Sequence, residues 1–385
     1  MKPTIYLVFV DDWELSGNGS GDVRELQFRP MRELVKIYNA HAVHGSFNAE
    51  VMQQLTFRKF QDQFPGLKAL ADEWDATAQE TFRQGHDIQL HIHPQWKDAE
   101  YQDGEWRLTA DWSILNYDAE EAYRMMAAGK EYLENLLRPV DPDYRCVSFR
   151  SGSWCIAPSP HMLGLLARLG IVFDMSIVGG MHYETKNIRL DYRNCEEDFL
   201  PYYPVMWDAR KVSDKREPIV CIPTNHFYGS RRQVLKHHLG KVWGKAKERV
   251  APTRAQRSSR SVEAYGHEWA QVGHASPIKR IYEKGILPYL KGKHLISDIA
   301  QLDYALLREM LASIRRRARA SGLNEIPIIL ENHTKDVQDF SHIERFIADV
   351  SKADDIKCVT LTELSREILS GRFQIKTAGL NKGRG

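Results

Sequence analysis

The sequence has few cysteines and no large excess of charge of either sign. Its 385 residues include only five cysteines, and none of them stands in a C-x-x-C pair. This usage does not favour a disulfide framework or a zinc site built from thiolates, and it is typical of a reducing compartment. The formal net charge is +2 at pH 7. The balance argues against a strongly basic nucleic-acid-binding protein.

Long apolar runs are also missing. No run approaches the length of about 20 residues that a transmembrane helix needs. Residues 5–10 follow Lys2 as in a signal peptide, but the run is short and ends in two aspartates without a small-residue cleavage site. No internal repeat is visible. We therefore expect a cytoplasmic globular protein, long enough for one large barrel or for two domains.

The stretch TIYLVFVDDWE, residues 4–14, organises the chain. Its apolar run of β-branched and aromatic residues predicts a strand buried on both faces, as in a parallel sheet. It ends in Asp11 and Asp12, two like charges that need a metal ion, a buried arginine or a shared proton to compensate them. Enzymes with (β/α) barrels keep their chemistry at such strand ends. Alternatively, the pair caps a following loop or helix.

The stretch DIQLHIH, residues 87–93, predicts another strand, which Pro94 ends. Because side chains alternate across a strand, the aliphatic residues face one side, and Gln89, His91 and His93 face the other. Two imidazoles on one face of a strand end favour a shared metal ion. The alternative is a strand with one polar side that faces solvent.

Further predicted strands end in polar groups. Residues 146–149 precede Arg150, residues 171–173 precede Asp174, and residues 326–330 precede His333. Strands alternate along the chain with helical patterns, the clearest at residues 30–39, 66–84, 118–137, 159–169 and 303–320. This alternation, with polar groups at one rim, predicts an α/β fold built as a parallel (β/α) barrel.

In this order the motifs resemble those of the polysaccharide deacetylases of the NodB-homology type, carbohydrate esterase family 4. FVDDWE resembles the T-F-D-D motif, GHDIQLHIHP the histidine motif, FRSGSW the R-x-P-x-G motif, and IILENH the closing L-x-x-H motif, while FDMS stands where the fourth motif falls. The resemblance covers about residues 4–174 and 326–333. Gln95 stands where the family has its second metal histidine, Gly152 replaces a proline, and Trp13 follows the aspartates in place of glycine.

The resemblance implies a distorted seven-stranded barrel and a metal-dependent amide hydrolase. By the family pattern Asp12 would be the metal carboxylate, with His91 and His93 as imidazole partners. The expected metal is divalent, with Zn²⁺ as the first candidate.

The same pattern implies the catalytic groups. Asp11 would take the proton of the attacking water, and Arg150 would hold its carboxylate. His333 would protonate the leaving nitrogen, with Asp174 raising its pKa. Arg150 as a structural ion-pair partner and Asp174 as a cap of the next turn are the alternatives.

The implied substrate is an N-acetylated sugar, as in the surface-polysaccharide (O-antigen) gene clusters that encode similar proteins. Without an export signal, a nucleotide-linked or lipid-linked sugar is favoured over a mature polymer. Three alternatives stay open: a deformylase, an amidohydrolase that opens a cyclic ureide without metal, and a binding protein that has lost the metal.

One barrel domain is expected over residues 1–375, with a basic insertion at about 231–300 and a disordered tail at 376–385. Within residues 231–260, ten lysines and arginines stand against one glutamate. Apolar residues at helical spacing among them favour an amphipathic segment that contacts a membrane or closes over the rim. A solvated surface run is the alternative.

Overall fold

The computed structural model describes residues 2–109, 111–184, 188–231, 235, 293–337 and 339–379. Its main sheet is entirely parallel and has the order β12-β7-β6-β3-β2-β1-β15, with β16 paired to β1. The strands of this sheet are β1 (Thr4–Trp13), β2 (Ser46–Glu50), β3 (Asp87–Ile92), β6 (Ser148–Ser151), β7 (Phe173–Asp174), β12 (Val220–Cys221), β15 (Glu325–His333) and β16 (Ile356–Cys358). In this order β1 lies next to the end strand β15 and also pairs with β16.

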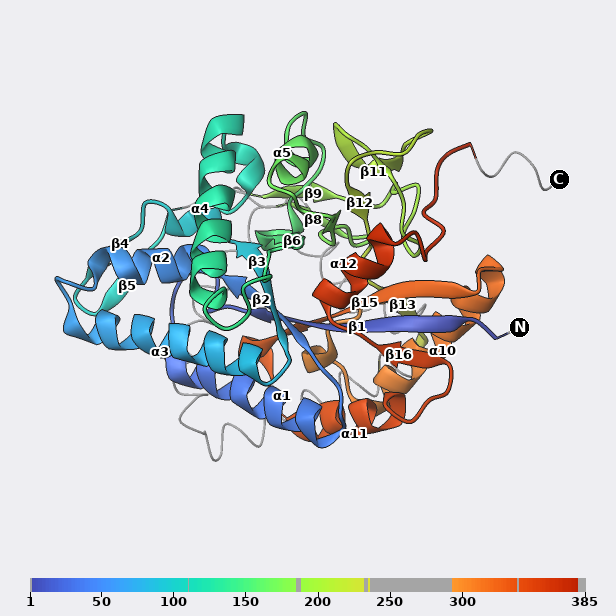
Figure 1. The fold of residues 1–385 in the computed structure, drawn as a ribbon, viewed down its shortest axis with the longest axis horizontal. Helices are drawn as coiled ribbons and strands as arrows, with labels where there is room; N and C mark the ends of the chain where they lie inside the picture. Colours follow the sequence, from blue (N-terminus) through green and yellow to red (C-terminus); the bar gives the residue numbers. More distant parts are fainter. Residues whose placement is uncertain are drawn as a thin grey trace.

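The two ends of the sheet meet after β12. Thr224 forms a parallel bridge with Ile329 of β15, and the N–H of Asn225 donates to the Ile329 carbonyl at 3.0 Å. This contact joins the outermost strands of the path, so the sheet curves into the distorted seven-stranded (β/α) barrel that the sequence predicts. The long strands β1 and β15 lie side by side in Figure 1, paired from Thr4 with Glu325 to Asp12 with His333.

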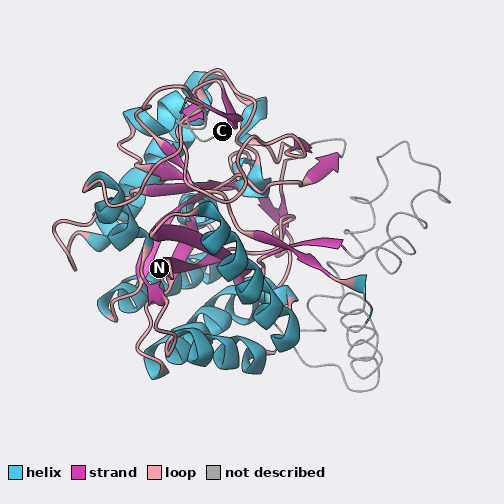
Figure 2. Ribbon diagram, turned by 90° about the vertical axis from the view of Figure 1, so that its right-hand side faces the viewer, coloured by secondary structure: helices cyan, strands magenta, loops and turns pink. Residues whose placement is uncertain are grey.

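Helices surround the strands, as Figure 2 shows. The α-helices are α1 (Arg29–Ala40), α2 (Val51–Phe60), α3 (Pro65–Arg83), α4 (Ala119–Leu137), α5 (Met162–Arg168), α10 (Tyr304–Ser321), α11 (Phe340–Val350) and α12 (Leu361–Leu369). Asp118 caps α4 by accepting the Glu121 N–H at 2.8 Å, as its position before the helix predicts. None of the helices in the described segments is long and apolar enough to cross a membrane.

Short elements decorate the barrel. The single-turn and π-type helices are η1 (Arg24–Phe28), η2 (Pro94–Trp96), η3 (Ile114–Asn116), η4 (Gly152–Trp154), η6 (Ile299–Gln301) and η7 (Thr334–Asp336). Within the described residues, four antiparallel strand pairs are formed by β4 (Glu100–Gln102) with β5 (Glu105–Arg107), β8 (His182–Glu184) with β9 (Arg189–Asp191), β10 (Pro204–Val205) with β11 (Asp208–Val212), and β13 (His226–Gly229) with β14 (Lys293–Ile296).

The sheet separates two apolar cores. The smaller core fills the barrel interior and includes Tyr6, Val8 and Val10 of β1 with Ile329 of β15. The larger core lies between the sheet and the helices and includes the alternate residues of β1, such as Phe9. Since successive side chains of a strand face opposite sides, each apolar residue of β1 belongs to one core or to the other.

Some expected elements differ from the observed ones. The strand predicted at 146–149 is β6 at Ser148–Ser151, and α2 and α11 have no counterpart among the predicted helices. Residues 97–117 contain the β4–β5 hairpin, whose Trp106 stacks on Phe57 at 5.5 Å between ring centroids. The amphipathic segment predicted within residues 231–260 lies outside the described residues, except for residues 231 and 235. Of the tail, residues 376–379 are described, and Lys376 bridges to Tyr202.

Candidate active site

Polar side chains gather inside the barrel at the carboxyl ends of its strands. Val8 and Val10 of β1 face the interior, so Asp12, two residues further, faces it as well. Asp12 contacts Asn48 of β2 and Arg150 of β6, and it lies near His333 of β15. All of these side chains are buried, so this end of the barrel holds a polar cluster above an apolar core.

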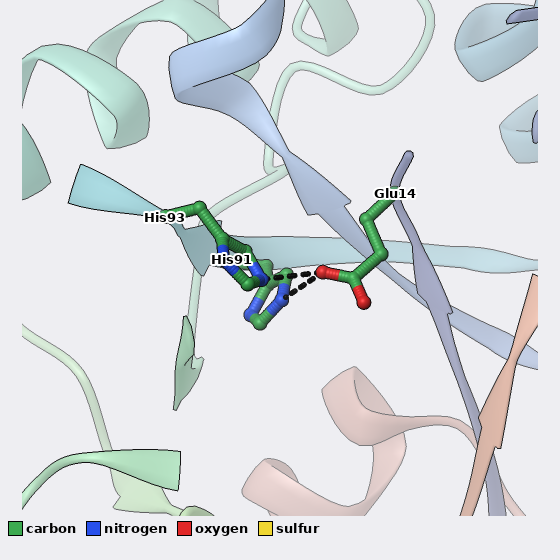
Figure 3. Close-up of side chains that lie close together, drawn as sticks. All are labelled: Glu14, His91 and His93. Atoms are coloured by element: carbon green, nitrogen blue, oxygen red, sulfur yellow. Dashed lines mark hydrogen bonds and ion pairs between the residues drawn. The ribbon is translucent and has the colours of Figure 1, made fainter. Parts of the chain in front are cut away.

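Glu14 lies with the two predicted histidines (Figure 3). Its Oε2 atom is 3.1 Å from His91 Nε2, and it also contacts His93 Nε2. The imidazole centroids are 4.7 Å apart with their planes at 85°. Lys335 Nζ contacts the other carboxylate oxygen. Burial raises the pKa of Glu14, but Lys335 and the histidines outweigh it and hold this pKa well below its usual value.

The environment of His91 directs its Nε2 atom toward Glu14. Its Nδ1 lies 2.9 Å from the Arg150 carbonyl oxygen, which can only accept a hydrogen bond, so Nδ1 carries a proton. Without a cation, Nε2 donates to the Glu14 carboxylate at 3.1 Å. With a cation bound there, the ring would keep only its Nδ1 proton, and a hydrogen bond from that nitrogen is how metal-binding histidines are commonly oriented.

His93 contacts the side chain that replaces the family histidine. The Gln95 amide nitrogen lies 3.0 Å from His93 Nδ1, and the amide oxygen is buried without a partner among the described residues. The same amide nitrogen donates to the Gly17 carbonyl oxygen at 3.2 Å, which fixes this orientation of the amide, and His93 Nε2 contacts Glu14. One carboxylate and two imidazoles form a donor set that suits a divalent cation such as zinc. The three side chains therefore fit a metal ion.

Asp12, the expected metal carboxylate, has other partners. It accepts hydrogen bonds from Asn48 at 2.8 Å and from Arg150 Nη1 at 3.2 Å, and Arg150 also donates to Glu331 at 2.8 Å. Burial raises the pKa of Asp12, but Arg150, His91 and His333 outweigh it and lower this pKa. The carboxylate that meets both histidines is thus Glu14, and Asp12 lies beside it as an ionised group held by Arg150.

Asp11, the expected base, lies on the other side of β1. It accepts hydrogen bonds from the Tyr38 hydroxyl at 2.7 Å and from the Asn332 amide, between the sheet and α1. Burial raises its pKa to about 7, and these two hydrogen bonds lower it only in part. Neighbouring residues of a strand cannot both face inward, so it is Asp12, and not Asp11, that lies in the interior with the histidines. The arginine expected to hold Asp11 holds Asp12 instead.

His333 belongs to a second group of ionisable side chains. Its Nδ1 is 3.0 Å from Asp298 Oδ2, and its Nε2 is 3.6 Å from Asp12 Oδ2. Burial lowers the pKa of His333, but Asp298 and Glu331 outweigh it and raise this pKa to about 10. Asp298, Glu331 and His333 are also close enough to hold a cation. The protonated imidazole lies against Asp298, and Arg150 lies between Glu331 and Asp12, so each carboxylate of this group already has a cation beside it.

Asp174, the expected partner of His333, is engaged elsewhere. Its carboxylate accepts the Ser176 hydroxyl at 2.6 Å and the Ser176 N–H at 3.1 Å. Burial raises its pKa to about 6. These contacts agree with the alternative prediction, in which Asp174 caps the next turn. The carboxylate that lies beside His333 is that of Asp298.

Several residues of this cluster were not predicted from the sequence. Glu14 was quoted in its motif without a role, although its spacing from Asp12 places both on one face of an extended strand. Asp298 lies near the end of the basic insertion predicted at about 231–300, which no motif covers. It reaches the rim through a parallel bridge to Glu331. Lys335 and Trp154 also belong to the cluster without having been predicted. The Trp154 indole donates a hydrogen bond to Glu331 at 2.9 Å.

No family model and no curated protein matches the sequence. Among solved structures, a protein described as a polysaccharide deacetylase from Mycobacterium smegmatis superposes with a TM-score of 0.51 at 15% identity, covering 98% of this chain and 94% of the other. A glycoside hydrolase/deacetylase from Parabacteroides distasonis gives 0.49 at 14% identity, with 97% and 72% covered. A polysaccharide deacetylase from Pseudomonas aeruginosa PAO1 gives 0.45 at 12%, with 96% and 93% covered. The chain thus has the barrel fold of the first of these proteins.

Proposed function

We propose that this protein is a metal-dependent hydrolase that removes an N-acyl group, with acetyl as the first candidate, from a sugar or sugar precursor. One observation carries the proposal: a buried carboxylate and two imidazoles lie beside an arginine-held aspartate and an aspartate-held histidine. These are Glu14, His91 and His93, then Asp12 with Arg150, and His333 with Asp298. Amide hydrolysis needs a polarised carbonyl, a base for water and an acid for the amine.

Glu14, His91 and His93 would hold the cation. A divalent cation in such a site supplies Lewis acidity toward the acyl carbonyl and makes water more acidic. Asp12 accepts the proton that water loses as its oxygen bonds to the acyl carbon. Arg150 keeps Asp12 ionised and fixed in place, since both side chains are buried and 3.2 Å apart.

His333 completes the reaction on the other side of Asp12. Its raised pKa of about 10 keeps the ring protonated at neutral pH. As the C–N bond breaks, the Nε2 proton passes to the departing nitrogen, which leaves as an amine. Asp298 accepts a hydrogen bond from Nδ1 and so orients Nε2 toward the reaction.

Lys335 supports a second candidate function. Its ammonium group contacts Glu14 and already provides one positive charge where a metal ion would add two. A protein that kept the barrel and binds sugars without a metal would use Lys335 in this way. The acyl group, the nucleotide or lipid carrier, the cytoplasmic location and a role in surface-polysaccharide synthesis stay predictions.

Metal content and acyl release together separate the two candidates. The purified protein is analysed for metals by mass spectrometry and then assayed for acetate and formate release from N-acylated nucleotide sugars. We expect about one divalent ion per chain, its loss in Glu14→Ala, and release that stops with a chelator. Glu100→Ala, at an exposed glutamate, is the matched control. Sugar binding without metal in the wild type would favour the binding protein.

A further inference from the structure

A cavity of about 600 Å³ adjoins the candidate active site. It lies among the β8–β9 hairpin, the β13–β14 strand pair and the turn after β7. Its volume falls in the range of small-molecule sites, about 300–1,000 Å³. Five aliphatic side chains and one methionine line much of its wall: Val178, Met181, Ile188, Leu190, Leu295 and Ile296.

Trp154 connects the cavity to the catalytic groups. Its ring lines the cavity, its Nε1 donates to Glu331 at 2.9 Å, and its ring centroid lies 5.7 Å from that of His333. The backbone φ angles of Ser153 and Trp154 are 55° and 56°, in the left-handed region that non-glycine residues rarely adopt. Strain of this kind persists where the surrounding structure holds it for a purpose. Here the strained backbone holds the Trp154 indole between the cavity and the catalytic groups.

The wall chemistry excludes a strongly polar occupant. Among the described lining residues, no side chain is Lys, Arg, Asp, Glu, Asn or Gln. A pyrophosphate would need cations beside it, and a sugar ring would need several partners for its hydroxyl groups. A hydrocarbon needs neither, and its transfer from water to an apolar wall is favourable.

The histidines of the wall do not change this conclusion. His226 Nε2 lies 2.9 Å from Asp198, whose other oxygen is 2.5 Å from Arg317 Nη2, so Asp198 already engages this imidazole. Burial and the neighbouring His226 lower the pKa of His294, which favours its neutral form. His182 is exposed at the cavity edge.

We infer that the cavity binds a hydrocarbon chain of the substrate. Resting on the function proposed above, the inference makes the substrate an amphiphile, an N-acylated sugar joined to an alkyl or isoprenoid group. The acyl amide lies at Glu14, His91 and His93, and the chain passes Trp154 into the cavity. This selects the lipid-linked class over the nucleotide-linked class.

The test uses alkyl β-D-glucosides, which carry a chain but no N-acyl group. Calorimetric titration below the critical micelle concentration compares ethyl, butyl, hexyl and octyl glucosides with the full chain. We expect affinity to rise about fourfold for each methylene that leaves water. Leu295 is half-buried in the wall, so Leu295→Trp should fill the cavity and abolish this rise.

Two further variants keep the test decisive. Leu295→Asp places a charge in the same wall without filling it and should also abolish the dependence on chain length. Leu369→Trp makes the tryptophan substitution at a residue that is 67% exposed on α12, and it should keep the full rise. Equal wild-type affinity for all four glucosides, or an unchanged rise in both folded Leu295 variants, overturns the inference.

The outcomes separate this inference from the proposed function. Chain-length-dependent binding without any acyl release leaves the hydrocarbon site standing and removes the proposed reaction. Acyl release with equal kcat/KM for methyl and octyl N-acetylglucosaminides leaves the reaction standing and removes the hydrocarbon site.

Discussion

Asp11 and Asp12 are adjacent in the sequence and completely buried, yet they lie in two different regions of the molecule. Asp12 faces the barrel interior, where Arg150 and His333 carry positive charge. Asp11 faces the layer between the sheet and α1, where its hydrogen-bond partners are the neutral groups of Tyr38 and Asn332. The pKa of Asp12 is lowered, whereas that of Asp11 is raised to about 7.

The comparison shows that burial alone does not decide the charge of a carboxylate. Desolvation is the largest contribution for both residues and raises both pKa values. The cations inside the barrel reverse it for Asp12, and hydrogen bonds from neutral groups do not reverse it for Asp11. The ionised carboxylate of this pair therefore lies on the interior face of β1, and Glu14 lies on the same face.

The largest expected effect comes from removing the interior ligand. Glu14→Ala should release the metal ion and lower kcat/KM by at least about a thousandfold, because a metal supplies several kcal/mol of transition-state stabilisation. Metal analysis and acyl-release kinetics measure both effects. If Glu14→Ala kept its metal while Asp12→Ala lost it, Asp12 would be the metal ligand, and the roles proposed for Glu14 and Asp12 would be wrong.

Next in size is the matched pair of substitutions at the two neighbours. Asp12→Asn removes the proposed base and should lower kcat by about 10²–10⁴-fold with the metal retained. Asp11→Asn is the same change one residue away and should leave kcat within a few-fold. Single-turnover assays on metal-loaded protein make the comparison. The reverse ranking would place the base in the layer between sheet and helix.

A smaller effect is expected at the acid. Asp298→Asn removes a charge-assisted hydrogen bond to His333 and should lower kcat about tenfold to a hundredfold. The loss should shrink for an N-acyl anilide, whose better leaving group needs less protonation. Asp174→Asn is the control, because its carboxylate contacts Ser176. An equal loss on both substrates would argue against His333 as the acid.

The last effect concerns the stability of the fold and its dependence on pH. Burial raises the pKa of Asp11 to about 7 from 3.8, so between these values the unfolded chain is ionised and the folded one is protonated. Folding stability from this group is full below about pH 4 and falls by about 1.4 kcal/mol per pH unit until pH 7. Asp11→Asn removes this dependence, so the free energy of unfolding of the variant should increase relative to that of the wild type as the pH rises.

Urea unfolding at several pH values between 4 and 7.5 measures that gain. Asp62→Asn, at an exposed aspartate, is the control and should show no such trend. A constant difference between Asp11→Asn and the wild type would mean that Asp11 is ionised in the folded protein.

Much of the barrel could be predicted from the sequence because its signals are local. The apolar run of β1, the alternation of β3 and the cap of α4 each depend on residues close together in the chain. The two histidines were placed on one face because the period of a strand is fixed. Short strands such as β7 and β12 carry two residues each, too few for a pattern to define their bounds.

The sequence by itself determined the strand ends, the facing histidines and the resemblance from which the barrel was predicted. Only the tertiary structure decided which carboxylate does what. Asp11 and Asp12 are equivalent as local patterns, and their roles depend on which face of β1 meets Arg150 from β6. Lys335 acquires its partner Glu14 only when β15 lies beside β1, more than three hundred residues away along the chain, and Asp298 meets His333 only when it bridges to β15. Charges interact through space, so chain order cannot assign them.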